Sequence, residues 1–196
     1  MKVDLPSKIF GIRSYTPLPF ILVMFIFARP TMVSLLAGFM VAALGETIRF
    51  WGVSVAGTET RTTGQVGGTH LFVDGPFGYV RNPLYVGNIL LYVGVGIMAN
   101  ALPPYLVLAA LGFFLLQYRL IVSKEEEYLA TTFGEEYSRY RAHVPRFLPR
   151  WKRYAGEHSF HRGPDLARGL QSERRTLQAF TLLAVAMVVL YFVQQG

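Results

Sequence analysis

The sequence predicts an all-α, polytopic membrane protein with about five transmembrane helices. Of its 196 residues, 52% are hydrophobic and only 16% are charged, whereas soluble domains carry about 25% charged residues. The charges are also unevenly spread, because residues 82–118 and 176–196 contain none. The mean hydropathy of +0.34 agrees with this class. The same composition argues against a disordered, collagen-like or coiled-coil chain.

The charge pattern and the absence of cysteine narrow the function. The formal net charge is +7, and residues 124–175 hold 11 of the 19 Lys and Arg beside eight of the 12 acids. A mixed, basic stretch next to apolar spans fits an anionic membrane surface on the cytoplasmic side better than it fits a nucleic acid. The chain has no cysteine, which excludes disulfides, thiolate nucleophiles and cysteine-ligated metals.

The first helix is predicted over residues 18–28, an apolar stretch that ends at Arg29-Pro30. This stretch is shorter than the roughly 20 residues that a spanning helix needs. An extension back toward Ile9, with Arg13 snorkelling to the interface, would supply the missing length. Because no small-residue cleavage site follows, we interpret the stretch as a retained helix rather than a signal peptide.

A second helix is predicted over residues 32–55. It contains Glu46 and Arg49 at a spacing of i,i+3, which lets the two side chains pair on one face. Charged residues inside a membrane are costly and usually face a bundle interior or a polar cavity. We therefore leave two interpretations open, a buried structural pair and a contribution to a substrate cavity.

A helical hairpin is predicted next, after a polar Gly- and Thr-rich loop over residues 57–81. Its first helix covers residues 83–99, with Pro83 in the first turn and Asn82 as N-cap. Residues 100–104 form a short turn, and the second helix of the hairpin covers residues 105–122.

The remaining chain is predicted to be an amphipathic segment followed by a last helix. Residues 123–153 are expected outside the bilayer, and Ser123 with Glu126 matches a capping box that starts a new or continued helix. The last helix is expected over residues 172–193. Because the basic stretches all fall on one side of five spans, the N-terminus is predicted to be cytoplasmic and the C-terminus to lie across the membrane.

Two segments flanking the hairpin carry candidate chemistry. Residues 75–87 form a Gly/Pro turn that enters a helix, where free backbone N–H groups and Arg81 would make an anion site. The acids at residues 125–127 stand where the hairpin leaves the membrane and would bind a cationic group or a ribose. The alternatives are an interfacial Arg anchor with packing glycines for the first segment, and a solvated charged face for the second.

A third segment, residues 133–149, alternates aromatic and charged side chains and ends in prolines. It would cover a pocket, or it would simply pack on the membrane surface. Other chemistry has little support. His158 and His161 are spaced i,i+3 without a third ligand, so no metal site is predicted. The sequence also contains no P-loop, no dinucleotide-binding fingerprint and no nucleophile elbow.

Together these segments resemble the isoprenylcysteine carboxyl methyltransferase family, within the wider group of membrane phospholipid methyltransferases. The family pattern is Arg-His-Pro-x-Tyr-x-Gly, a helical hairpin, Glu-Glu-x-x-Leu, Phe-Gly-x-x-Tyr-x-x-Tyr and a Pro-rich end. The chain reads RNPLYVG at 81–87, EEEYL at 125–129, FGEEYSRY at 133–140 and RFLP at 146–149. The resemblance implies one integral membrane domain over 1–196, with a motif-bearing core at about 45–150 and an additional C-terminal helix at about 172–194.

The resemblance also implies a site. It would bind S-adenosyl-L-methionine near the cytoplasmic face, beneath the segment that follows the hairpin. The residues aligned with cofactor-binding positions are Arg81, Asn82, Tyr85, Gly87, Glu125, Glu126, Tyr137, Tyr140, Arg146, Phe147 and Pro149. The candidate catalytic residues are Arg81, Glu126, Arg49 and Glu46. Asn82 stands where the family has His, so proton transfer by that side chain is not available here.

The methyl acceptor is predicted to be a lipophilic molecule that enters from the bilayer, with the carboxylate of a prenylcysteine-like substrate favoured. Arg49 or Arg81 would orient such an anion. A phospholipid amine, which would need a base such as Glu46, and a small thiol are alternative acceptors. The competing functions are an NADPH-dependent sterol-type reductase and a membrane scaffold without enzymatic activity.

Overall fold

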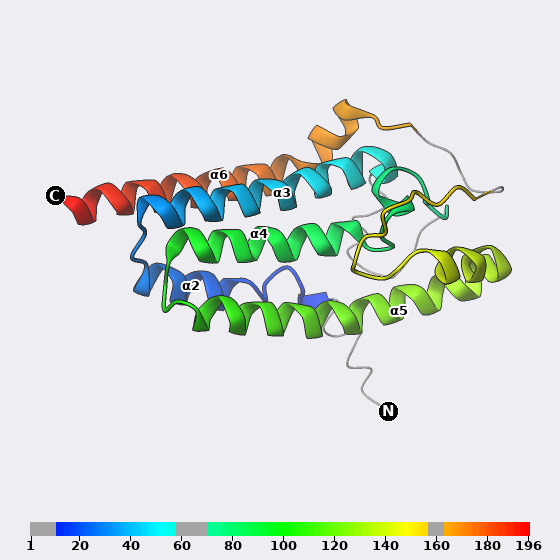
Figure 1. Cartoon of the computed structure of the whole chain (residues 1–196), viewed down its shortest axis with the longest axis horizontal. Helices are drawn as coiled ribbons and strands as arrows, with labels where there is room; N and C mark the ends of the chain where they lie inside the picture. The colour runs from blue at the N-terminus through cyan, green and yellow to red at the C-terminus, as the bar shows by residue number, and fades with distance from the viewer. Residues whose placement is uncertain (1–10, 58–69, 157–162) are drawn as a thin grey trace.

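The computed structural model describes residues 11–57, 70–156 and 163–196, and within them every regular element is helical (Figure 1). The elements in chain order are α2 Leu18–Phe27, α3 Met32–Ala56, η2 Gly75–Gly78, α4 Pro83–Ala99, α5 Tyr105–His143 and α6 Leu166–Gln195. The five α-helices lie side by side, with α4 between α3 and α5 and with α6 along α3.

Three of these helices, α3, α5 and α6, are long and apolar enough to cross a membrane, which confirms the predicted class of helical membrane protein. The other two are shorter, with 10 residues in α2 and 17 in α4. The first helix begins at Leu18 after a series of turns, so it does not run back through Arg13. Ile9 lies outside the described residues.

Glycines bring α3 and α4 into backbone contact. A Cβ atom built on Gly94 would lie 2.4 Å from Ala42 N, and one on Gly87 would lie 2.6 Å from Gly45 O. Both distances are too short for any side chain, so the two helices can approach this closely only because glycine has no Cβ. Gly87 therefore serves helix packing, which was the alternative to a ligand-binding role for this glycine.

The second helix of the hairpin continues well beyond the apolar stretch. The sequence left open a new or a continued helix at Ser123, and the helix continues, because α5 runs through that position to His143 and the predicted capping box does not form. The Ser123 hydroxyl instead donates to Arg119 O at 2.7 Å, one turn earlier in the same helix. The regular path breaks at Gly134, where φ is 52° and ψ is −120°. The break redirects the last turns, which carry two of the predicted site tyrosines.

The last helix, α6, begins six residues before the predicted start and lies antiparallel to α3 along its length. Asp165 caps it by accepting from Arg168 N at 3.0 Å, and Asp165 N donates to Ser54 O near the end of α3. At the other end, Gln194 Nε2 donates to Ala28 O at 3.0 Å, just before α3 begins. The start of α6 is therefore bonded to the end of α3, and its end is bonded to the turn between α2 and α3.

Candidate active site

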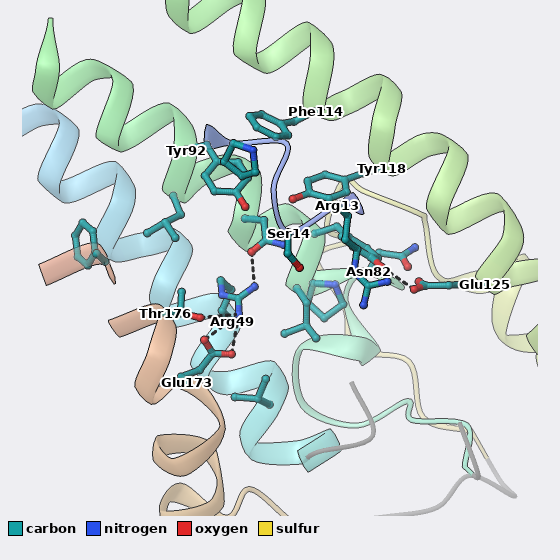
Figure 2. Close-up of a pocket in the computed structure, with 18 of the residues that line it drawn as sticks. Arg13, Ser14, Arg49, Asn82, Tyr92, Phe114, Tyr118, Glu125, Glu173 and Thr176 are labelled. Atoms are coloured by element: carbon teal, nitrogen blue, oxygen red, sulfur yellow. Dashed lines mark hydrogen bonds and ion pairs between the residues drawn. The ribbon is translucent and has the colours of Figure 1, made fainter. Parts of the chain in front are cut away.

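A cavity of about 760 Å³ lies among the helices, and residues of all five α-helices line it. Figure 2 shows two polar groups in it, with the aromatic side chains of Tyr92, Phe114 and Tyr118 close by. One polar group contains Asn82 and Glu125, and the other contains Arg49, Glu173 and Thr176. We call the hollow the central cavity. Its volume falls within the range of about 300–1,000 Å³ that is usual for small-molecule sites.

Next to Glu125 in the chain, Glu126 is buried between two arginines. Glu126 Oε1 lies 3.3 Å from Arg81 Nη1 and accepts from Arg146 Nε at 3.1 Å. Arg146 Nη2 also donates to Glu126 Oε2. Arg81 Nη1 further donates to the Tyr137 hydroxyl at 3.4 Å. We call Arg81, Glu126, Tyr137 and Arg146 the rim cluster. It joins the start of α4 to both parts of α5 and to the chain beyond.

The neighbouring acid, Glu125, has a different partner. The Tyr85 hydroxyl donates to Glu125 Oε1 at 2.6 Å, and the Tyr85 and Tyr118 rings lie 4.7 Å apart. All three side chains line the central cavity. The cavity wall thus combines a carboxylate, hydroxyls and aromatic faces, which suits a ligand with both polar and flat parts.

The segment after α5 is tied across the start of α4 by main-chain hydrogen bonds. Arg81 N donates to Pro145 O at 2.9 Å, and Arg150 N donates to Tyr79 O at 3.0 Å. Asn82 occupies the N-cap position of α4, but its side chain makes no cap and donates instead to Arg146 O at 3.2 Å. The structure therefore brings together RNPLYVG and RFLP, two motifs that are more than 50 residues apart.

The tyrosines after the Gly134 break support this arrangement. The Tyr140 hydroxyl donates to Phe77 O at 2.8 Å. Burial raises the pKa of the Tyr137 and Tyr140 phenols above the ordinary value. Both groups therefore stay neutral and act as hydrogen-bonding groups rather than as bases at physiological pH.

The second polar group is built around Arg49 of α3. Arg49 Nη2 lies 2.8 Å from each carboxylate oxygen of Glu173 and 3.5 Å from Thr176 Oγ1, both on α6. Arg49 Nη1 donates to Asn88 Oδ1 of α4. Arg49 Nε lies 3.6 Å from Glu46 Oε2, so the predicted i,i+3 pair is present. We call Arg49, Asn88, Glu173 and Thr176 the inner cluster.

Most of the predicted site residues line the central cavity, and some do not. The lining residues are Arg49, Arg81, Asn82, Tyr85, Glu125, Glu126, Tyr137 and Tyr140. The predicted residues outside the lining are Glu46, Gly87, Arg146, Phe147 and Pro149. Arg146 reaches the site through Glu126, while Phe147 packs against the aromatic cluster that includes Phe114 and Tyr118.

Sequence reasoning missed several polar residues that line the cavity, among them Arg13, Asn88, Glu173 and Thr176. A signal existed for two of them. Asn88 is a polar residue inside the uncharged stretch, and Glu173 is an acid at the beginning of the predicted last helix. Both patterns mark a helix position that faces a polar interior.

No group of three metal-ligating side chains occurs in the part of the chain that the structure describes. His158 and His161, the pair considered from the sequence, lie outside the described residues.

Comparisons with known proteins match the part of the chain that contains most of the candidate site. The pattern of the family described as "Phospholipid methyltransferase" matches residues 33–136. The cobalt-zinc-cadmium resistance protein CzcN of Cupriavidus metallidurans is 32% identical over 121 residues, covering 61% of this chain and 51% of the relative. The nickel-cobalt-cadmium resistance protein NccN of Alcaligenes xylosoxydans xylosoxydans is 32% identical over 92 residues, or 47% and 42%.

An enzyme is also among the relatives. The protein-S-isoprenylcysteine O-methyltransferase of Schizosaccharomyces pombe is 33% identical over 81 residues, which are 41% of this chain and 34% of the yeast protein. The chain therefore spans about half or less of the length of the curated relatives that it matches. No solved structure matches it significantly.

Proposed function

The chain belongs to the phospholipid methyltransferase family, and on that premise we propose that it transfers a methyl group from S-adenosylmethionine to a lipophilic acceptor in the membrane. The observation that carries this proposal is the central cavity. It gathers polar residues from motifs far apart in the chain within a bundle of apolar helices. In the proposed function, such a cavity would admit a lipid from the bilayer and a polar cofactor from the cytosol.

The residues of the cavity fit the proposed cofactor. S-adenosylmethionine, when bound, supplies an electrophilic methyl group on a positively charged sulfur. Arg81 Nε is buried without a hydrogen-bond partner within the described residues, so this guanidinium keeps a donor for an anionic group. Glu125, held by Tyr85, offers a carboxylate to amino or hydroxyl groups. The aromatic wall offers flat apolar surfaces, which would help to keep water from the site of methyl transfer.

Within this site Glu126 would act by holding other residues. Its carboxylate is already engaged by Arg81 and Arg146, so its contribution would be to fix Arg81 and to hold the segment after α5 against the start of α4. A buried pair that loses one partner leaves an uncompensated charge, so removal of Glu126 would disturb both arginines together.

A carboxylate is the acceptor that the site favours, as in a prenylcysteine-like molecule. Support comes from Arg49 in the cavity wall and from the name of the yeast relative. A carboxylate needs no base, because it attacks as the anion and becomes a neutral ester. A phospholipid amine would need one, and Glu46, the candidate base, is outside the residues that line the cavity.

The proposed cofactor site is tested by calorimetry with S-adenosylhomocysteine on detergent-solubilised protein. Arg81→Ala and Glu126→Ala are each expected to abolish binding, while size-exclusion behaviour and helical circular dichroism stay those of the wild type. Glu127→Ala is the matched control, because this adjacent side chain is 70% exposed and should bind normally.

The same calorimetry separates the alternatives. Wild-type affinity in both the Arg81 and Glu126 variants would remove this site assignment. Saturable binding of NADPH in place of S-adenosylhomocysteine would favour a reductase, and binding of neither would favour a scaffold. Mass spectrometry of a membrane extract incubated with the protein and a labelled methyl donor then identifies the acceptor.

A further inference from the structure

The C-terminal helix contributes polar residues to the central cavity although it lies beyond the family match, which ends at residue 136. Glu173, Thr176 and Phe180 of α6 all line the cavity. Thirty residues long and largely apolar, α6 could have been a simple membrane anchor. Its contacts with α3, however, fix which face of α6 points into the cavity.

The start of α6 is fixed to the end of α3 in a way that sets its rotation. The capped N-terminus is held by the bond from Asp165 N to Ser54 O, at 2.8 Å. One turn later, a Cβ atom on Gly169 would lie 3.1 Å from Ser54 Cβ, so the helices nearly touch here. One further turn along, Glu173 lies on the same helix face and meets Arg49.

Glu173, the acid of the inner cluster, is fully buried. Its relative exposure is 0%, and both of its oxygens lie 2.8 Å from Arg49 Nη2. A buried carboxylate is costly unless it is paired and hydrogen-bonded. This pair therefore holds the guanidinium in one place on the cavity wall.

The hydrogen-bond donors of Arg49 leave capacity for a ligand. A guanidinium has five N–H donors. The two on Nη2 point to the Glu173 oxygens, and one on Nη1 goes to Asn88. The donor on Nε is buried without a hydrogen-bond partner within the described residues, 3.6 Å from Glu46 Oε2. It would serve an acceptor oxygen brought into the cavity.

We propose that Glu173 is a positioning residue that fixes Arg49, and that α6 forms the acceptor-side wall of the central cavity. This inference rests on the proposed methyltransferase function and adds the last helix to its site. Arg49 would donate to an anionic oxygen of the acceptor, a carboxylate or a phosphate. Glu173 would act only through Arg49, and the cofactor end at the rim cluster would not depend on it.

The test uses purified full-length protein, a labelled methyl donor at saturating concentration and a titrated membrane lipid extract as acceptor. Glu173→Gln keeps the shape of the side chain and removes its charge. We expect the half-saturating extract concentration to rise about tenfold, while the affinity for S-adenosylhomocysteine changes less than twofold. Glu173→Asp keeps the charge and should recover part of the loss. Leu182→Ala, which alters a 71% exposed position of α6, should match the wild type.

A double-mutant cycle separates positioning from general stability. Because Glu173 is argued to act through Arg49, Glu173→Gln should cause no further loss in an Arg49→Met background. A further loss there, a matching fall in S-adenosylhomocysteine affinity, or wild-type kinetics in Glu173→Gln would each overturn the inference.

The same experiment distinguishes a failure of the proposed function from a failure of the inference about Glu173. Wild-type protein that binds no S-adenosylhomocysteine or labels no lipid overturns the methyltransferase proposal and the inference with it. If the wild-type protein does both, then wild-type kinetics or lowered S-adenosylhomocysteine affinity in Glu173→Gln, or a further loss in the Arg49→Met background, overturns the inference alone.

Discussion

At the scale of single residues, two adjacent carboxylates in α5 have different surroundings. Glu125 accepts from Tyr85 on the cavity wall, and Glu126 lies between Arg81 and Arg146. Successive residues of an α-helix point about 100° apart, so neighbouring acids meet different helices. Glu125 is the acid placed to contact a ligand, and Glu126 is the acid placed to hold the rim cluster together.

Packing at single glycines gives a stability prediction. Gly94→Ala would put a methyl group 2.4 Å from Ala42 N and 2.6 Å from Gly38 O, both backbone atoms that cannot move aside. Overpacking of this kind costs about 1–3 kcal/mol or more, so we expect a clear fall in the thermal unfolding midpoint in detergent.

Gly112→Ala on α5 is the control for this prediction. No atom lies within 4 Å of a Cβ built there, and alanine favours a helix by up to about 1 kcal/mol over glycine. The unfolding midpoint should stay the same or rise. Equal midpoints for the Gly94 and Gly112 variants would contradict the close approach of α3 and α4.

At the scale of elements, the break in α5 decides where the tyrosines of the rim lie. Gly134 has a positive φ and no atom within 4 Å of a built Cβ, so its substitution acts only through the backbone. Gly134→Ala would cost about 1–3 kcal/mol in this conformation. A straightened helix avoids that cost but carries Tyr137 and Tyr140 away from the rim.

We therefore expect Gly134→Ala to weaken S-adenosylhomocysteine binding at least tenfold in calorimetry. Thr132→Ala, at an exposed position of the same helix, should bind as the wild type does. Unchanged affinity and unfolding midpoint in the Gly134 variant would show that the break is not needed for the site.

At the scale of the whole molecule, the charge pattern predicts the orientation in the membrane, because basic segments favour the cytoplasmic side. The absence of cysteine allows a direct test with single cysteines. Trp151→Cys, at a position 99% exposed after α5, should react with a membrane-impermeant maleimide only from the cytoplasmic face. Tyr105→Cys, at a position 76% exposed at the start of α5, should react only from the opposite face. Labelling of both from one side would contradict the proposed topology.

Helix positions were largely determined by the amino-acid sequence alone. Helix α4 has the predicted bounds, Pro83–Ala99, and α3 ends within one residue of the predicted end. Apolar stretches and prolines set these limits locally, because membrane helices need length and satisfied backbone groups. The sequence left the continuation of α5 past Ser123 open, because a capping-box pattern also fits a helix interior.

The sequence by itself also placed the candidate chemistry near the hairpin, because the polar motifs interrupt apolar stretches. Only the tertiary structure decided which faces of the helices meet. Glu173 and Arg49 are 124 residues apart, and their pairing depends on the rotation of α6 about its own axis. An evenly apolar membrane helix shows little periodicity to reveal that rotation. Contacts between helices set it instead, here at Ser54 and Gly169.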